Sequence, residues 1–114
     1  MTFSHFFAER LGRPPYEYQE RLAAMPIGNR AIHVPTGAGK TAAVVLAWLW
    51  RRRTGDAPRR LVYLLPMRTL VDQTYAAAKD WARDDAKVYK MLGGEVEEEW
   101  EKHPEEPAIV IGTI

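Results

Sequence analysis

The stretch from Val34 to Thr41, "VPTGAGKT", combines residue types that can hold phosphate groups. Gly37 and Gly39 permit close backbone approach, and the N–H groups at the start of a following helix attract phosphate oxygens. Lys40 is then placed to reach the β- and γ-phosphates of ATP, and the Thr41 hydroxyl to bind Mg²⁺. The spacing therefore predicts a phosphate-binding loop, in which Lys40 and Thr41 are the residues nearest the chemistry. The predicted loop consists of Thr36, Gly37, Ala38, Gly39, Lys40 and Thr41.

The flanking sequence supplies the strand and the helix that such a loop requires. "RAIHV", Arg30 to Val34, is typical of a short strand, and the residues from Lys40 to about Arg53 are typical of a buried helix. The longer pattern G-x-x-x-x-G-K-[ST] is missed by one position, because Val34 stands where its first glycine belongs. The shorter pattern T-G-x-G-K-T is complete.

Two further stretches could contact ligands. Tyr16 and Gln19 precede the loop at a helix start, and a glutamine amide can donate to and accept from an adenine edge. "LLPMRTLVDQT" follows an apolar strand, and its Arg68, Thr69 and Gln73 could contact a nucleic-acid backbone. The alternative for each stretch is a structural one, in which these residues are solvated or cap a helix.

The remaining periodicity predicts an α/β fold. Strands and helices alternate after the first two helices, which favours a mainly parallel sheet with helices on both faces. "LGGEVEEEW" is predicted to be a loop opened by glycines. The other predicted helices are Ser4 to about Leu11, Tyr16 to Met25 and Arg68 to about Arg83; the other predicted strands are Arg60–Leu65, "KVYKML" and Pro107–Thr113.

The composition is that of an ordinary soluble domain. The 114 residues are 46% hydrophobic and 27% charged, and they include no cysteine, which excludes disulfides and thiolate metal sites. The longest apolar run, Ala42 to Trp50, is too short to span a membrane, and no signal peptide opens the chain, so a cytoplasmic location is expected. Arginines cluster over residues 51–60 and glutamates over residues 95–106. Both runs are interpreted as solvated faces, with nucleic-acid contact as the alternative for the arginines.

The motifs follow an order that resembles the superfamily-2 helicases. Members of that family carry a Q-type glutamine, a T-G-x-G-K-T loop, a P-x-R-x-L-x-x-Q stretch, a G-G loop and a strand-end G-T. The matching residues are Gln19, "PTGAGKT", "PMRTLVDQ", Gly93-Gly94 and Gly112-Thr113. The sequences "VPTGAGKTAAVVLAWLWRRR" and "LGGEVEEEWEKHPEEPAIVIGT" are similar to the N-terminal part of the helicase of type I CRISPR systems, a helicase-nuclease.

The resemblance implies a RecA-like phosphate-loop domain that is incomplete, comprising the first part of helicase lobe 1. Residues 1–29 would be N-terminal helices with the Q-type adenine motif, and residues 30–114 a partial ATP-binding lobe. The family implies ATP-driven movement on single-stranded DNA in antiviral defence, with recruitment by the CRISPR surveillance complex and no membrane partner. Position by position, the family places ATP on Gln19 and the loop, and nucleic acid on Arg68, Thr69, Gln73, Gly94 and Thr113.

Parts of the family's catalytic machinery have no counterpart in this sequence. The one adjacent pair of aspartates, Asp84-Asp85, follows a predicted helix rather than a strand, so it does not match the acidic motif that holds Mg²⁺. A second lobe with an arginine finger is absent, and His5, His33 and His103 stand alone rather than in a nuclease signature. The chain is therefore interpreted as an N-terminal helicase fragment. The alternatives are another phosphate-loop enzyme, such as a kinase, and a short nucleotide-binding module without hydrolysis.

Overall fold

The computed structural model describes residues 1–25, 39–55, 57–92, 95–96 and 105–113. These residues form two compact units, Met1–Ala57 and Pro58–Ile114. The sequence-based division into N-terminal helices, residues 1–29, and a partial ATP-binding lobe, residues 30–114, stays a prediction. None of the helices among the described residues is long and apolar enough to cross a membrane.

The first unit consists of helices, whose ends follow from local chemistry. The Thr2 hydroxyl accepts a hydrogen bond from the His5 backbone N–H at 3.2 Å and caps the first helix, which ends at Gly12 with φ 87°. The helices are α1 (Phe3–Leu11), α2 (Glu17–Ala24) and α3 (Lys40–Arg53).

Helix α3 provides most of the core of this unit. Its apolar residues from Ala42 to Leu49 are almost all buried, as the sequence predicted for a helix that is apolar nearly all round. Phe6 and Phe7 of α1 are fully buried, and the Phe6 ring packs on Trp50 with 5.6 Å between ring centroids. Both α1 and α2 pack against α3.

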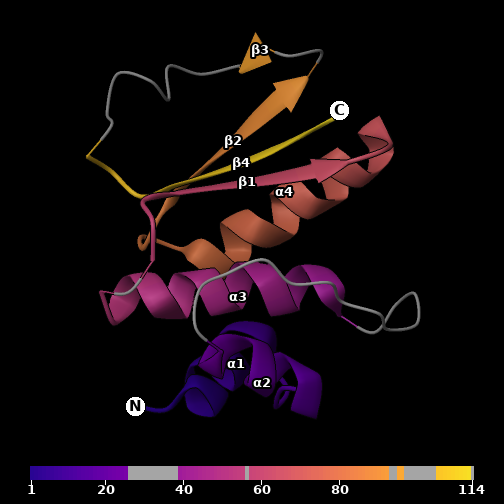
Figure 1. Cartoon of the computed structure of the whole chain (residues 1–114). Helices are drawn as coiled ribbons and strands as arrows, with labels where there is room; N and C mark the ends of the chain where they lie inside the picture. Colours follow the sequence, from indigo (N-terminus) through magenta and orange to yellow (C-terminus); the bar gives the residue numbers. More distant parts are fainter. Residues whose placement is uncertain (26–38, 56, 93–94, 97–104, 114) are drawn as a thin grey trace. The chain divides into compact units, whose positions relative to one another are not determined.

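The second unit is a sheet with one long helix (Figure 1). The strand order is β1-β4-β2-β3, in which β1, β4 and β2 run parallel and β3 pairs antiparallel with β2. Parallel pairing places the carboxyl ends of β1, β4 and β2 at one edge of the sheet, which we call the carboxyl edge. The elements are β1 (Arg60–Leu65), α4 (Arg68–Ala82), β2 (Lys87–Leu92), β3 (Glu95–Val96) and β4 (Ala108–Thr113).

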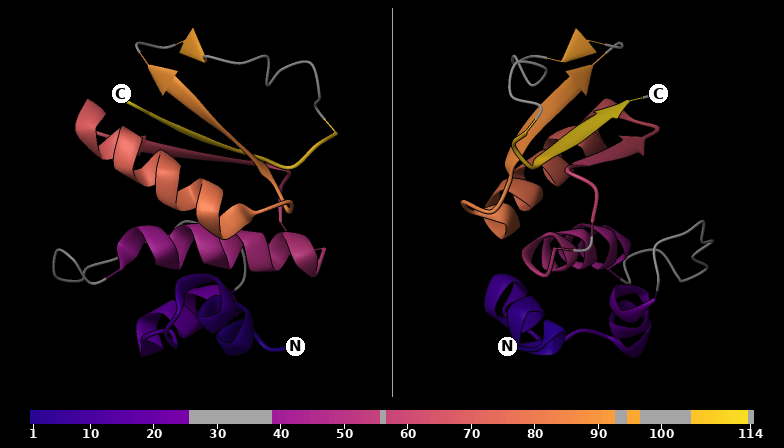
Figure 2. Two further views of the ribbon diagram at one scale, coloured as in Figure 1. Left: turned by 180° about the vertical axis from the view of Figure 1, so that it is seen from behind. Right: turned by 60° about the vertical axis from the view of Figure 1, so that its left-hand side comes forward.

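Helix α4 covers one face of this sheet (Figure 2). Lys90 of β2 marks that face, because its ammonium lies 3.0 Å from the Asp72 carboxylate and 4.7 Å from the centroid of the Tyr75 ring, both on α4. The register puts Ile109 and Ile111 of β4 on the same face, and both are fully buried. Apolar burial under α4 therefore holds the helix against the sheet.

The predicted α/β class with a mainly parallel sheet is confirmed, and it is consistent with part of a RecA-like lobe. The predicted bounds of α3, β1 and β2 agree with the structure. The prediction that "LGGEVEEEW" is a loop throughout was wrong, because Glu95 and Val96 pair with Leu92 and Met91. The predicted strand Arg30–Val34 lies outside the described residues.

Candidate nucleotide and nucleic-acid site

Three residues of the predicted phosphate loop lie in the described part of the chain. Gly39 has φ 77° and ψ 34°, a left-handed conformation that glycine adopts at little cost, and α3 begins at the next residue. Lys40 is exposed and Thr41 is half-buried in the first turn. That turn contains no acidic residue, so no carboxylate there offsets the partial positive charge of the helix end. Thr36, Gly37 and Ala38 lie outside the described residues, and their predicted roles stay predictions.

Gln19 joins the predicted adenine motif to this loop. Its side-chain amide is fully buried. The Oε1 atom accepts a hydrogen bond from the Tyr16 backbone N–H at 2.7 Å, which forms part of a capping box at the start of α2. The Nε2 atom donates to the Gly39 carbonyl oxygen at 3.0 Å, across twenty residues of sequence. The Gln19 side chain also forms a hydrogen bond with Tyr18. The predicted contact of Gln19 with adenine stays a prediction.

The fit between Gln19 and Gly39 leaves no space for a side chain at residue 39. A Cβ built on Gly39 would lie 2.6 Å from Gln19 Nε2 and 3.2 Å from Arg13 Nη2. Glycine therefore suits this position through its positive φ, and any side chain here would displace the Gln19 amide from its present place.

Tyr16 and Arg13 form the exposed flank of this contact. The Tyr16 ring is 50% exposed, and the Arg13 guanidinium lies 4.5 Å from its centroid. Tyr16 was predicted as a nucleotide contact. Its backbone N–H donates to Gln19 Oε1, and its contact with a nucleotide stays a prediction. Arg13 was not predicted, because nothing in the spacing of "GRPPYEYQ" separates it from an ordinary surface arginine.

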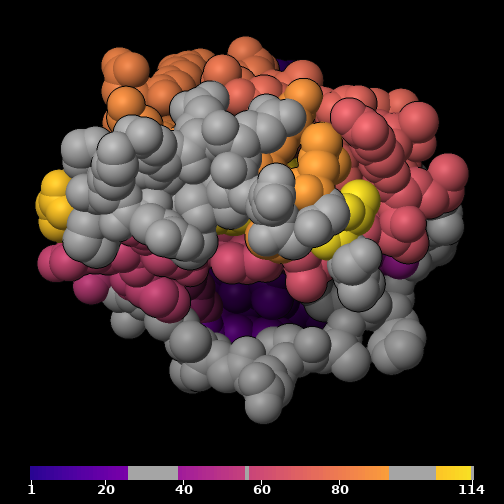
Figure 3. Space-filling view, turned by 90° about the horizontal axis from the view of Figure 1, so that it is seen from above, coloured from indigo at the N-terminus to yellow at the C-terminus, as the bar shows by residue number. Residues whose placement is uncertain are grey.

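The structure brings most of the predicted nucleic-acid residues to the carboxyl edge. Arg68 and Thr69 are exposed in the first turn of α4, directly after β1, and Gln73 is exposed about one turn further along. Thr113 is half-buried at the end of β4 and pairs with Leu65, the last residue of β1. In the space-filling view, the end of β4 is visible between the surfaces of α4 and β2 (Figure 3). Gly94 lies outside the described residues.

Gly112, in the predicted G-T motif, is explained by packing between strands. A Cβ there would lie 2.6 Å from the Met91 carbonyl oxygen and 2.9 Å from the Met91 Cβ. The glycine thus lets β4 lie against β2, and it places Thr113 at the carboxyl edge.

The arginine run is only partly a solvated face. The Arg51 guanidinium donates to the Leu22 carbonyl at 3.3 Å, and the Arg52 guanidinium donates to the Ala57 carbonyl at 2.7 Å. The guanidinium of Arg53 lies 5.1 Å from the centroid of the Phe6 ring. These arginines therefore tie α3 to neighbouring backbone and rings, and Arg59, an exposed residue, is the member of the run best placed to meet a ligand.

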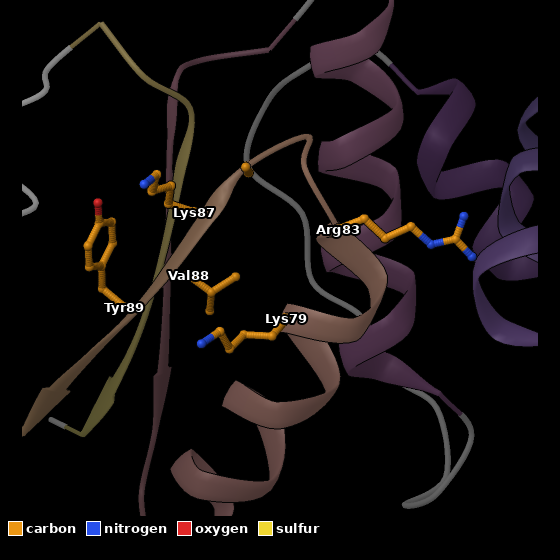
Figure 4. Close-up of a pocket in the computed structure, with 6 residues that line it drawn as sticks. Lys79, Arg83, Lys87, Val88 and Tyr89 are labelled. Atoms are coloured by element: carbon orange, nitrogen blue, oxygen red, sulfur yellow. The ribbon is translucent and has the colours of Figure 1, made fainter.

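A pocket of about 310 Å³ lies at the opposite edge of the sheet, near the start of β2. It is lined by Lys79, Arg83 and Lys87 among others, but the Arg83 side chain points away from the ammonium groups of Lys79 and Lys87 (Figure 4). The three cations thus do not converge on one ligand. Asp84 and Asp85 lie in the turn before β2, away from the carboxyl edge, which agrees with their rejection as the acidic motif. The described residues include no cluster of three metal-binding side chains.

Comparison with known proteins finds a matching family and similar relatives. The DEAD/DEAH box helicase family matches residues 16–114. "DEAD-box ATP-dependent RNA helicase 29" of Oryza sativa subsp. indica is 37% identical over an alignment of 82 positions, which covers 68% of this chain and 10% of that protein. "ATP-dependent RNA helicase DBP10" of Yarrowia lipolytica is 38% identical over 82 residues, 68% of this chain and 9% of that protein. The DBP10 protein of Lodderomyces elongisporus is 30% identical over an alignment of 120 positions, which covers 97% of this chain and 13% of that protein. The chain spans about a tenth of the length of these relatives.

Proposed function

Because this chain belongs to the DEAD/DEAH box helicase family, we propose that it forms the ATP-binding part of the first lobe of a superfamily-2 helicase. The observation that carries the proposal is the hydrogen bond from Gln19 Nε2 to the Gly39 carbonyl oxygen. It connects the Q-type motif to the glycine that starts α3, so that a nucleotide on one motif lies within reach of the other. A kinase of another phosphate-loop class gives no reason for this connection.

ATP would lie with its phosphates at the start of α3. Lys40 is exposed there and free to reach the phosphates, and the uncompensated helix end adds attraction for their charge. The Thr41 hydroxyl is the group in this first turn that would hold Mg²⁺ together with phosphate oxygens, which suits a cation that prefers oxygen ligands. Bound Mg²⁺ would neutralise phosphate charge.

The carboxyl edge would hold a single strand of nucleic acid. Arg68, Thr69 and Thr113 offer one guanidinium and two hydroxyl groups on elements that end at the same edge. Such groups suit phosphate and sugar oxygens, which a translocating enzyme must contact without regard to base sequence. No acidic residue lies in the first turn of α4, so its N-terminus adds to the attraction for phosphate.

We propose single-stranded DNA as the strand, and the CRISPR surveillance complex as the partner of the full-length protein. The support is the resemblance of the long stretches around the phosphate loop and the C-terminal "PAIVIGT" to type I CRISPR helicases. RNA is the second candidate, since the relatives at 37% and 38% identity are named RNA helicases.

Nucleotide titration tests the first part of this function. The chain should bind Mg-ATP, and Lys40→Ala should weaken binding by a few kcal/mol at most, since a charged contact to phosphate is lost. Isothermal calorimetry measures both affinities. Lys79→Ala, which removes an equal charge in the other unit, is the control. Equal affinity of the wild type and Lys40→Ala would refute the role of Lys40.

Anisotropy titrations with labelled oligonucleotides test the second part. DNA and RNA of one sequence, titrated at two salt concentrations, should separate the two candidates, and affinity should fall with salt for either. Arg68→Ala should weaken binding, while charge reversal at Arg59 and Arg60 should leave it largely unchanged. The reverse outcome would assign the strand to the arginine run instead of the carboxyl edge.

A further inference from the structure

Arg13 lies beside the start of α3, although it belongs to none of the motifs. Its Nη2 atom lies 3.2 Å from the position that a Cβ on Gly39 would take. The guanidinium lies near two rings, 4.5 Å from the centroid of Tyr16 and 5.7 Å from that of Phe7. Its Nη1 atom donates to the Pro14 carbonyl oxygen at 3.2 Å. The side chain is therefore fixed in direction and still has N–H donors to spare.

Positive charge gathers beside Gly39. Arg13, Lys40 and the N-terminus of α3 bring positive charge to one place, and the first turn of α3 holds no acidic residue. The ion pairs of the described residues include Arg10 with Glu9 and Lys90 with Asp72, and neither of these contains Arg13 or Lys40. Like charges that lie close together repel one another, and an anion that joins them makes the arrangement more favourable.

We propose that Arg13 is a further nucleotide-binding residue, whose guanidinium contacts the phosphate chain of the bound nucleotide. This inference rests on the proposed nucleotide-binding function and adds a second cation to it besides Lys40. Stacking on Tyr16 pre-organises the planar guanidinium, so little conformational freedom is lost when phosphate oxygens bind. Arg13 would thus couple the exposed tyrosine of the Q-type motif to the phosphates.

The competing explanation is that Arg13 only supports the Tyr16 ring. Inorganic triphosphate separates the two explanations, because it has the phosphate chain of ATP and no base. If Arg13 contacts the phosphates, Arg13→Gln should weaken the binding of inorganic triphosphate and of ATP by the same factor. That factor is about tenfold for one lost charged hydrogen bond. If Arg13 only supports the Tyr16 ring, Arg13→Gln should lower the affinity for ATP and leave the affinity for inorganic triphosphate unchanged.

The experiment measures displacement of a fluorescent ATP analogue from the chain by ATP and by inorganic triphosphate. Arg21→Gln is the matched control, since it removes one exposed arginine charge from the same unit. Arg13→Lys keeps the charge but not the planar stack, so it should bind both ligands more tightly than Arg13→Gln does. Circular dichroism reports whether each variant is folded, and Arg13→Lys serves as the test if Arg13→Gln unfolds.

Each outcome decides the matter. A tenfold loss of affinity for both ligands in Arg13→Gln, with unchanged affinities in Arg21→Gln, supports the contact between Arg13 and the phosphates. Unchanged affinity in Arg13→Gln, or a loss confined to ATP, overturns it, while weakening by Lys40→Ala leaves the nucleotide-binding function standing. Failure of the wild-type chain to bind either ligand overturns the proposed function itself.

Discussion

Replacing Gly39 with alanine should destabilise the first unit through two separable effects. The left-handed conformation at φ 77° costs a non-glycine residue about 1–2 kcal/mol. The new Cβ would also lie 2.6 Å from Gln19 Nε2, so the buried amide must move and lose its bond to the Gly39 carbonyl, a further cost of about 1–3 kcal/mol. The free energy of unfolding should therefore fall by about 2–5 kcal/mol.

Two other glycines provide matched controls. Gly12 and Gly55 have φ 87° and 86°, and a Cβ on either would meet nothing within 4 Å. Gly12→Ala and Gly55→Ala should therefore show the conformational cost alone, about 1–2 kcal/mol. Urea unfolding followed by tryptophan fluorescence measures all three, and a midpoint shift converts to free energy through the m value.

The double variant Gln19→Ala/Gly39→Ala completes the test. Once the Gln19 amide is absent, the substitution at Gly39 should cost less than in the wild type and approach the cost at Gly55, since only Arg13 Nη2, at 3.2 Å, remains near the new Cβ. If Gly39→Ala alone is no more destabilising than Gly55→Ala, the contact between Gln19 and the loop does not contribute to stability, and the reasoning is refuted.

Further predictions concern the sheet, the catalytic step and pH. Gly112→Ala should push β4 from Met91 and reduce single-strand affinity and stability together, and unchanged thermal unfolding would count against the packing explanation. The purified 114-residue chain should hydrolyse ATP near the background rate, because no arginine finger was identified in its sequence and such a residue alone contributes about 10³ to 10⁵ in rate. A phosphate-release assay that shows DNA-stimulated turnover would contradict this. Burial raises the pKa of the Tyr18 phenol above 10.0, so its contribution to stability is complete below pH 10.0 and is lost as the pH rises through the raised pKa. Tyr18→Phe should therefore lose less stability than the wild type when unfolding is measured above that pH.

Features governed by local sequence could be predicted, and features governed by contacts between distant residues could not. The ends of α3 follow from Gly39 before it and from the residues after Arg53, so its bounds were predictable. β3 was missed because two residues carry no periodicity, and only pairing with β2 makes them a strand.

The same distinction applies to the site. The position of Gln19 in the Q-type motif was clear from its spacing, but its burial and its bond to Gly39 depend on how α2 packs against α3. Arg13 gave no signal at all, because its significance comes from two rings and a glycine that the sequence keeps apart. Arg51 and Arg52 were interpreted as solvated for the same reason, since their carbonyl partners are not visible in a charge pattern.

The central position of β4 in the sheet affects how the protein folds while the ribosome synthesises it. β4 lies between β1 and β2, yet it is made after both of them. At 5–20 residues per second, about 40 residues separate the completion of β1 from the start of β4, a delay of roughly 2–8 seconds. Until β4 is made, β1 has no strand partner among the described residues, and β2 has only the two-residue β3. Such unpaired strand edges can associate wrongly or be bound by chaperones.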